Sequence, residues 1–170
     1  MKVIGIDPGL AATGIGIVTG TGLKVCDAVF GGIYTAKERS LPDRLARIHD
    51  RLSELLQQES PDLMVVEDIF SLDRYPKSGI NLGKVTGVIL LAGQKCRLPV
   101  LEVPVREAKK VLTGNGNASK VQLEKAVRHL LAFANPIKPF HASDALALAL
   151  IGMFRFPFRD TGPVRGSAAK

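Results

Sequence analysis

Short apolar runs and longer amphipathic stretches follow one another along the chain, a pattern that predicts alternating strands and helices. Residues 1–34 are rich in β-branched residues interrupted by glycine turns, so they predict three consecutive strands that pair as antiparallel neighbours. In later stretches, apolar residues recur at helical spacing with polar residues between them. We expect strands at residues 2–6, 14–19, 23–34, 62–66 and 99–103, and helices at residues 41–59, 79–95, 105–112, 120–133 and about 141–154.

The order of these elements predicts an α/β fold. A three-strand meander followed by alternating helices and strands gives a mixed five-stranded sheet with helices on both faces. The chain has 170 residues, which is the size of one domain and enough for a buried core. We expect one domain over residues 1–156 and a flexible basic tail over residues 157–170, where Gly, Pro, Ser and Arg occur without periodicity.

The distribution of charge narrows the kind of partner. The formal net charge is +7, which favours a polyanionic partner. Residues 1–70 carry 7 basic and 10 acidic side chains, residues 71–130 carry 11 and 4, and residues 131–170 carry 5 and 2. The basic excess is therefore concentrated in the middle of the chain and is absent from its first part.

Cysteine content and apolar length exclude several classes of protein. Cys26 and Cys96 stand far apart and outside any metal-type spacing, so we expect two reduced thiols in a cytoplasmic protein. The longest apolar stretch, residues 85–93, is far shorter than the roughly 20 residues of a membrane span. The first residues reach the charge of Asp7 too early for a signal peptide. We expect no attachment to a membrane.

Three acidic residues stand where apolar segments end or begin. Asp7 ends the first expected strand and Glu67 ends the fourth. Asp144 begins the last helix, three residues after His141, so these two side chains can share a helix face. If the first and fourth strands are neighbours, the carboxylates meet at one rim of the sheet. Such a cluster is costly unless a divalent cation neutralises it, and two Mg²⁺ ions held by carboxylates can support a phosphoryl displacement.

Each of these residues also has a simpler interpretation. Asp7 can be a turn former beside the following Pro-Gly pair, Glu67 a solvated charge at a strand end, and Asp144 a carboxylate favoured by the helix dipole. His141 can be a surface histidine near the helix cap. Taken singly, the residues favour these interpretations, because functional carboxylates are a minority of all carboxylates.

The sequence around the acidic residues changes this balance. Three segments resemble, in order and spacing, the signatures of the RuvC family, the bacterial Holliday (crossover) junction endodeoxyribonucleases. They are residues 5–16 (GIDPGLAATGIG), residues 66–70 (VEDIF) and residues 141–149 (HASDALALA). The resemblance covers about residues 1–155, and three such motifs in order are far more specific than one.

The resemblance implies an RNase H-like fold and a homodimeric endonuclease. Members bind four-way DNA junctions and make paired, symmetric nicks during homologous recombination and DNA repair. Asp7, Glu67 and Asp144 match catalytic carboxylates that bind two Mg²⁺ ions, for which Mn²⁺ can substitute. His141 stands where well-known members have a fourth acidic residue, so we include it in the catalytic and metal-binding set, and whether it binds metal or transfers a proton stays open. The resemblance also implies a functional link to a RuvAB-type branch-migration complex in the bacterial cytoplasm.

The basic residues of the middle of the chain, residues 71–130, are then a candidate DNA-binding surface, which we call the DNA track. Phe70 matches a family aromatic that stacks on junction bases, and Lys109 and Lys120 match lysines near the scissile phosphate. The polar loop of residues 113–118 precedes a capping-box pattern and can offer backbone N–H groups to a phosphate. The expected DNA-binding residues are Phe70, Arg74, Lys77, Lys84, Lys109, Lys110 and Lys120.

The expected helix at residues 79–95 combines small and apolar residues on all sides, which is typical of a buried or interface helix. In the family this region contributes to the dimer contact, and a two-fold dimer matches a substrate cut in two strands.

Three other functions compete with junction cleavage. The Asp-Pro-Gly run and the Thr-Gly pair near the start resemble the first phosphate loop of actin-like and sugar-kinase-like ATPases, but the chain is too short for that two-domain fold. A general RNase H-like nuclease acting on RNA or RNA–DNA hybrids and an inert junction-binding module are the other two. The intact Asp7, Glu67 and Asp144 argue against the inert module.

Overall fold

The architecture comes from a computed structural model that describes residues 1–68 and 76–155, with side chains described from residue 79 in the second range. Two of the expected DNA-binding residues, Phe70 and Arg74, and the predicted tail of residues 157–170 lie outside the described residues. The elements are β1 (Lys2–Asp7), β2 (Ala12–Thr21), β3 (Lys24–Tyr34), α1 (Leu41–Glu59), β4 (Leu63–Glu67), α2 (Pro76–Lys95), β5 (Val100–Val103), α3 (Val105–Thr113), α4 (Lys120–Leu130) and α5 (Phe140–Arg155).

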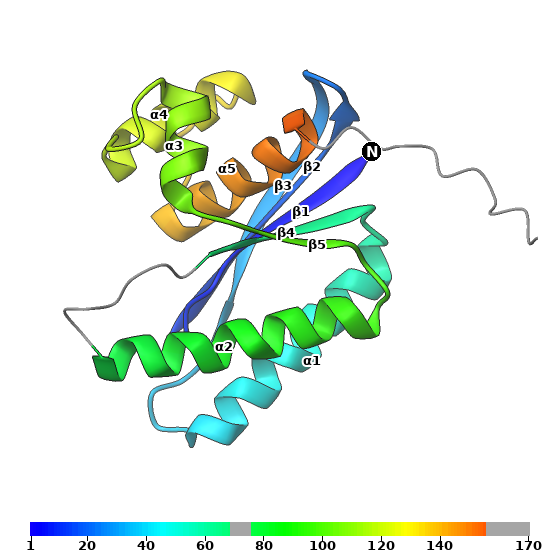
Figure 1. Ribbon diagram of the computed structural model, residues 1–170, viewed down its shortest axis with the longest axis vertical. Helices are drawn as coiled ribbons and strands as arrows, with labels where there is room; N and C mark the ends of the chain where they lie inside the picture. The colour runs from blue at the N-terminus through cyan, green and yellow to red at the C-terminus, as the bar shows by residue number, and fades with distance from the viewer. Residues whose placement is uncertain (69–75, 156–170) are drawn as a thin grey trace, which may run out of the picture.

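The five strands form one mixed sheet in the order β3-β2-β1-β4-β5 (Figure 1). The first three strands pair antiparallel, whereas β4 and β5 extend the sheet in parallel from β1. The α/β class and the mixed five-stranded sheet predicted from the sequence are confirmed.

Three elements have bounds that differ by two or three residues from those expected, and the others agree to within one residue. β2 is longer at both ends than residues 14–19, because it pairs with β3 from Ala12 to Thr21. α2 begins at Pro76 rather than at residue 79, and proline is favoured in the first turn of a helix. α4 ends at Leu130 rather than at residue 133, because Ala132 adopts a left-handed conformation with φ 51° that a helix cannot contain.

The two faces of the sheet bury separate apolar cores. Alternate residues of β1 contribute to each, with Val3 in the core beneath α3, α4 and α5, and Ile4 and Ile6 in the core beneath α1 and α2. Figure 1 shows the two helical layers on opposite sides of the sheet, as the sequence predicted. β1 and β4 are the central strands, and the same alternation sets the face of the sheet to which their last side chains point.

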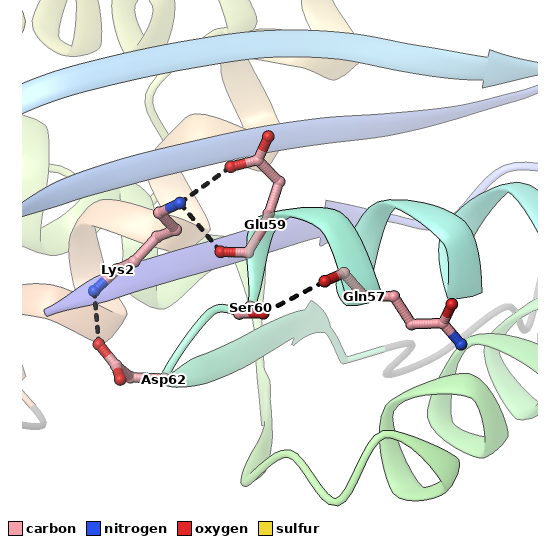
Figure 2. Close-up of polar contacts among 5 residues, drawn as sticks. All are labelled: Lys2, Gln57, Glu59, Ser60 and Asp62. Atoms are coloured by element: carbon pink, nitrogen blue, oxygen red, sulfur yellow. Dashed lines mark hydrogen bonds and ion pairs between the residues drawn. The ribbon is translucent and has the colours of Figure 1, made fainter.

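The start of β1 is attached to the turn between α1 and β4 (Figure 2). Lys2 N donates to Asp62 Oδ2 at 2.7 Å, and Lys2 Nζ donates to the Glu59 carbonyl and to Glu59 Oε2, both at 2.9 Å. Ser60 ends α1 in the left-handed region, and its hydroxyl donates to the Gln57 carbonyl at 3.2 Å. These contacts fix the register of β1 against β4, so the far ends of both strands stop at the same edge.

α5 lies directly on the backbone of β1 and β2. A Cβ on Gly5 would stand 2.0 Å from the Ala145 carbonyl oxygen, and one on Gly16 would stand 2.5 Å from Leu146 N. Both distances are far below van der Waals contact, so only glycine admits the helix at this depth. The α5 residues from Ala142 to Met153 are all buried.

Two further expectations concern cysteines and membranes. Cys26 is exposed and Cys96 is partly buried, and both are free thiols. Within the ranges that the structure describes, no helix has the length and apolar character needed to cross a membrane.

We predict that Gly16→Ala lowers the free energy of unfolding, by an amount near the upper end of the range of about 1–3 kcal/mol that overpacking costs. The reason is that the new methyl group meets the backbone of a buried helix. Gly31→Ala is the matched control, since a Cβ on this β3 glycine has no neighbour within 4 Å. We expect the control to change stability by less than about 1 kcal/mol. Urea unfolding of both variants measures the difference, and equal stabilities would contradict the close seating of α5.

Candidate active site

The carboxylates of Asp7 and Glu67 come together because β1 and β4 are parallel neighbours. Ile6 pairs with Val66 in the register of the two strands. The next residue of each strand, Asp7 or Glu67, therefore lies at the same edge of the sheet. Because Ile6 and Val66 face the core beneath α1 and α2, the two carboxylates point to the opposite face, toward α5. The neighbouring strands on which the predicted cluster depends are thus confirmed.

The first turn of α5 brings His141 and Asp144 to this edge. Gly14 pairs with Asp7 across β1 and β2. A Cβ on Gly14 would stand 2.2 Å from the His141 carbonyl oxygen and 3.2 Å from the Asp7 Cβ. Asp144 is almost fully buried, with 4% of its surface exposed. The absence of a side chain at position 14 therefore lets the start of α5 rest beside Asp7.

Asp7 is protonated at neutral pH. Burial is the largest cause, and the hydrogen bond and negative charge of Glu67 and then the charge of Asp144 act in the same direction, so the pKa of Asp7 rises from 3.8 to about 9. The positive charge of Lys120 opposes this rise. The protonated carboxyl of Asp7 can then donate a hydrogen bond to Glu67, and the edge carries one negative charge fewer than it would with an ionised Asp7.

Asp144 pairs with Lys120, at the start of α4. Lys120 Nζ lies 3.1 Å from Asp144 Oδ2, and the lysine side chain remains 62% exposed. Burial lowers the pKa of Lys120, but the charge of Asp144 and the hydrogen bond to it, together with the other two carboxylates, raise the pKa above its usual value. Lys120 is therefore a charged ammonium group that solvent and ligands can reach.

His141 is neutral at pH 7 and contacts Tyr34 at the end of β3. Burial lowers the pKa of His141, and Lys120 lowers it further, while the charge of Asp144 opposes both. Tyr34 Oη lies 3.4 Å from His141 Nε2, and the two rings meet edge to face with centroids 5.8 Å apart. Sequence reasoning missed Tyr34, because 107 residues separate it from His141 and no local motif marks it.

The set of ligand atoms suits a hard divalent cation. Carboxylates from β1, β4 and α5 meet at one edge, and Asp144 Oδ1 is buried without a hydrogen-bond partner. Across the side chains described, no group of three His, Cys, Asp or Glu residues is close enough to enclose a metal ion as it stands. The residues fit a cation that takes the place of the Asp7 proton and of the Lys120 ammonium.

The other predicted DNA-binding lysines lie on helices that cover both faces of the sheet (Figure 1). On α3, Lys109 is half-buried and Lys110 is exposed, and Lys84 is exposed on α2, which covers the other face of the sheet (Figure 1). Lys77 lies in the first turn of α2, where the backbone alone is described. Of the lysines whose side chains are described, Lys120 is the one that the structure pairs with a site carboxylate.

The loop before α4 keeps most of its backbone donors for itself. Asn117 N donates to Asn115 Oδ1 at 2.9 Å, and Ala118 N donates to the Asn115 carbonyl at 3.0 Å. Ser119 N donates to Gln122 Oε1 at 2.8 Å as part of the predicted capping box, which is present. The expectation that this loop offers N–H groups to a phosphate is therefore weakened, and side chains are left as the means of binding one.

Comparison with known proteins identifies relatives over most of the chain. The family model described as crossover junction endodeoxyribonuclease RuvC matches residues 3–152. The crossover junction endodeoxyribonuclease RuvC of Carboxydothermus hydrogenoformans is 40% identical over 158 residues, which cover 91% of this chain and 97% of that protein.

Solved structures agree with the sequence matches. The RuvC of Thermus thermophilus in complex with Holliday junction substrate has a TM-score of 0.83 at 32% identity, covering 91% of this chain and 93% of that chain. The yeast mitochondrial Holliday junction resolvase has a TM-score of 0.59 at 13% identity, covering 90% and 77%, and shares the fold alone. The fold is RNase H-like, as the resemblance implied.

The raised pKa of Asp7 makes stability depend on pH in a defined direction. Because folded Asp7 binds its proton more tightly than unfolded Asp7, folding takes up a proton between pH 3.8 and about 9. Without divalent cations, we predict that its contribution to the free energy of unfolding falls as pH rises through this window, by at most about 1.4 kcal/mol per pH unit. Asp7→Asn removes this dependence.

Urea unfolding in EDTA at several pH values, compared between wild type and Asp7→Asn, measures this contribution. Asp27→Asn is the control, because Asp27 is an exposed carboxylate of β3. Millimolar Mg²⁺ should stabilise the wild type at high pH by occupying the carboxylate edge. The same pH dependence in wild type and Asp7→Asn would show that Asp7 is not held protonated.

Proposed function

This chain belongs to the RuvC family of crossover junction endodeoxyribonucleases, and we propose that it resolves four-way DNA junctions by symmetric, Mg²⁺-dependent nicks in two opposed strands. The main support for this proposal is that Asp7, Glu67 and Asp144 meet at one edge of a protein with net charge +7. Binding of a polyanion needs the basic surface, and hydrolysis of its backbone needs the acidic edge.

Asp7, Glu67, Asp144 and His141 are the residues that would hold the metal. Two bound Mg²⁺ ions, for which Mn²⁺ can substitute, would activate a water molecule and stabilise the leaving oxygen. The fold holds the carboxylate oxygens that would bind the metal in fixed positions. Asp7 and Glu67 lie on neighbouring central strands, and Asp144 lies on a buried helix. Such rigid elements hold catalytic groups more accurately than loops do.

Lys120 would be free to bind the substrate once Asp144, its carboxylate partner, binds a metal ion. Its side chain is 62% exposed at the carboxylate edge, and its raised pKa keeps it charged. A lysine binds a phosphate as a point charge without reading the base. We assign Lys120 and Lys109 to the scissile phosphate, and Lys110, Lys84 and Lys77, with Arg74 and the stacking residue Phe70, to the rest of the DNA.

The exposed side of α2 supports the proposed homodimer. Val85, Ile89 and Ala92 of this helix are buried against the sheet, but Ile80 and Leu91 keep 60% and 50% of their surface exposed. Exposed apolar side chains of this size favour a protein contact when they share a surface. A two-fold dimer through α2 would give two identical sites for the two strands of a junction.

Composition along the chain supports a nuclease domain over residues 1–156 followed by a basic tail over residues 157–170. Two further proposals rest on the family alone. The protein works in the bacterial cytoplasm together with a RuvAB-type branch-migration complex.

The test compares cleavage of a four-way junction, a linear duplex of the same sequence and an RNA–DNA hybrid, each with Mg²⁺ or with EDTA. We predict that the junction alone is cut, that cutting requires the metal, and that Asp7→Asn, Glu67→Gln and Asp144→Asn each lower the rate at least about 100-fold. Asp27→Asn is the control for the loss of one exposed carboxylate. Preferential cutting of the hybrid would replace this proposal with a general RNase H-like activity.

A second prediction concerns the DNA track. Loss of one phosphate contact reduces the slope of log binding constant against log salt concentration by about 0.9 on B-DNA. We predict this change for Lys109→Ala and for Lys110→Ala in junction binding measured in EDTA. Lys24→Ala is the matched control, because Lys24 begins β3 at the end of the sheet opposite Asp7. An unchanged slope in both α3 variants would remove α3 from the track.

A further inference from the structure

Among the residues that the structure describes, the hydroxyl of Tyr34 is the side-chain group within hydrogen-bond distance of the His141 imidazole. Oη lies 3.4 Å from Nε2, and the rings are inclined at 68°. Gly32, two residues earlier on the same face of β3, makes room for the histidine, since a Cβ there would stand 3.1 Å from Nε2. The end of β3 therefore contacts the imidazole ring through Tyr34 and leaves space for it at Gly32.

Tyr34 stands on a backbone that is fixed from two sides. Arg47 Nε, on α1, donates to the Tyr34 carbonyl at 2.8 Å. The next residue, Thr35, donates its N–H to the Ala11 carbonyl at 3.1 Å, which joins the end of β3 to the loop after Asp7. The position of the tyrosine is thus set by the same framework that sets the carboxylate edge.

The two ring nitrogens of a neutral imidazole have opposite roles, one as donor and one as acceptor. Nε2 faces the tyrosine, and within the described part of the chain Nδ1 has no hydrogen-bond partner. Whether His141 binds metal or accepts a proton, it needs a lone pair on the nitrogen that is left free. A partner that accepts a hydrogen bond from one nitrogen fixes the lone pair on the other, as is usual for metal-binding histidines.

We propose that Tyr34 is a positioning residue for catalysis, whose hydroxyl accepts the Nε2–H of His141 and so keeps the ring oriented with its lone pair on Nδ1. This inference rests on the proposed function in that it takes His141 to belong to the catalytic set. It assigns a task to a residue that lies outside all three sequence signatures.

The test uses Tyr34→Phe, which keeps the ring and its edge-to-face contact but removes the hydroxyl. Phe30→Leu is the matched control, because Phe30 lies four residues earlier on the same face of β3, is 42% exposed and packs against Phe133 rather than His141. His141→Ala and the double variant Tyr34→Phe with His141→Ala complete the cycle. Single-turnover cleavage, junction affinity in EDTA and the ¹⁵N chemical shifts of the His141 ring in the DNA-free protein are measured.

We expect Tyr34→Phe to slow single-turnover cleavage about tenfold with junction affinity within twofold of wild type. The His141 ¹⁵N shifts should move toward those of free imidazole, and Phe30→Leu should change neither quantity. In the His141→Ala background, removal of the hydroxyl should have no further effect, because the residue through which it acts is gone.

Two results would overturn the assignment. One is a Tyr34→Phe protein with unchanged ¹⁵N shifts and rate. The other is a tenfold loss that persists in the His141→Ala background, which would place Tyr34 on the DNA instead. The ¹⁵N measurement needs no substrate, so it stands even if the wild-type protein cuts no junction, and failure of the proposed function is thereby distinguished from failure of this inference.

Discussion

The close packing of α5 on the backbone of β1 and β2 is the constraint on which the candidate active site depends. Side chains at positions 5, 14 and 16 would overlap the backbone of the helix, so three glycines set its depth above the sheet. At that depth the first turn of α5 places Asp144 and His141 beside the strand end that carries Asp7. A helix held even one methyl group higher would separate the carboxylate of α5 from those of the strands.

The electrostatics of the site follow from this geometry. Three carboxylates that the fold forces together cannot all be ionised and unpaired, and the structure resolves the conflict with a proton on Asp7 and an ion pair between Asp144 and Lys120. Both solutions use a positive charge that a divalent cation can replace. The edge is therefore a place where the fold carries an electrostatic cost, as catalytic sites commonly do.

The sequence allowed prediction of those features that are local in the chain. β-branched runs marked the strands, and the ends of apolar runs marked Asp7 and Glu67, because period-two alternation and strand order decide both face and edge. Two kinds of feature could not be predicted from the sequence. Gly14 and Gly16 were interpreted as strand residues, whereas their importance lies in a helix more than 120 residues later. Tyr34 could not be linked to His141, because their contact depends on where β3 and α5 meet in space.

The carboxylates and the cations of the site differ in how firmly they are held. Asp7 and Glu67 end strands that are paired on both sides, and Asp144 is 4% exposed, whereas the side chain of Lys120 is 62% exposed. In the proposed function, a rigid acidic edge defines one place for the reacting phosphate, and exposed ammonium groups can contact DNA backbones that follow different paths. Since lysines carry no information about bases, these lysine contacts select a substrate by the shape of its backbone. That division suits an enzyme that recognises the form of a junction.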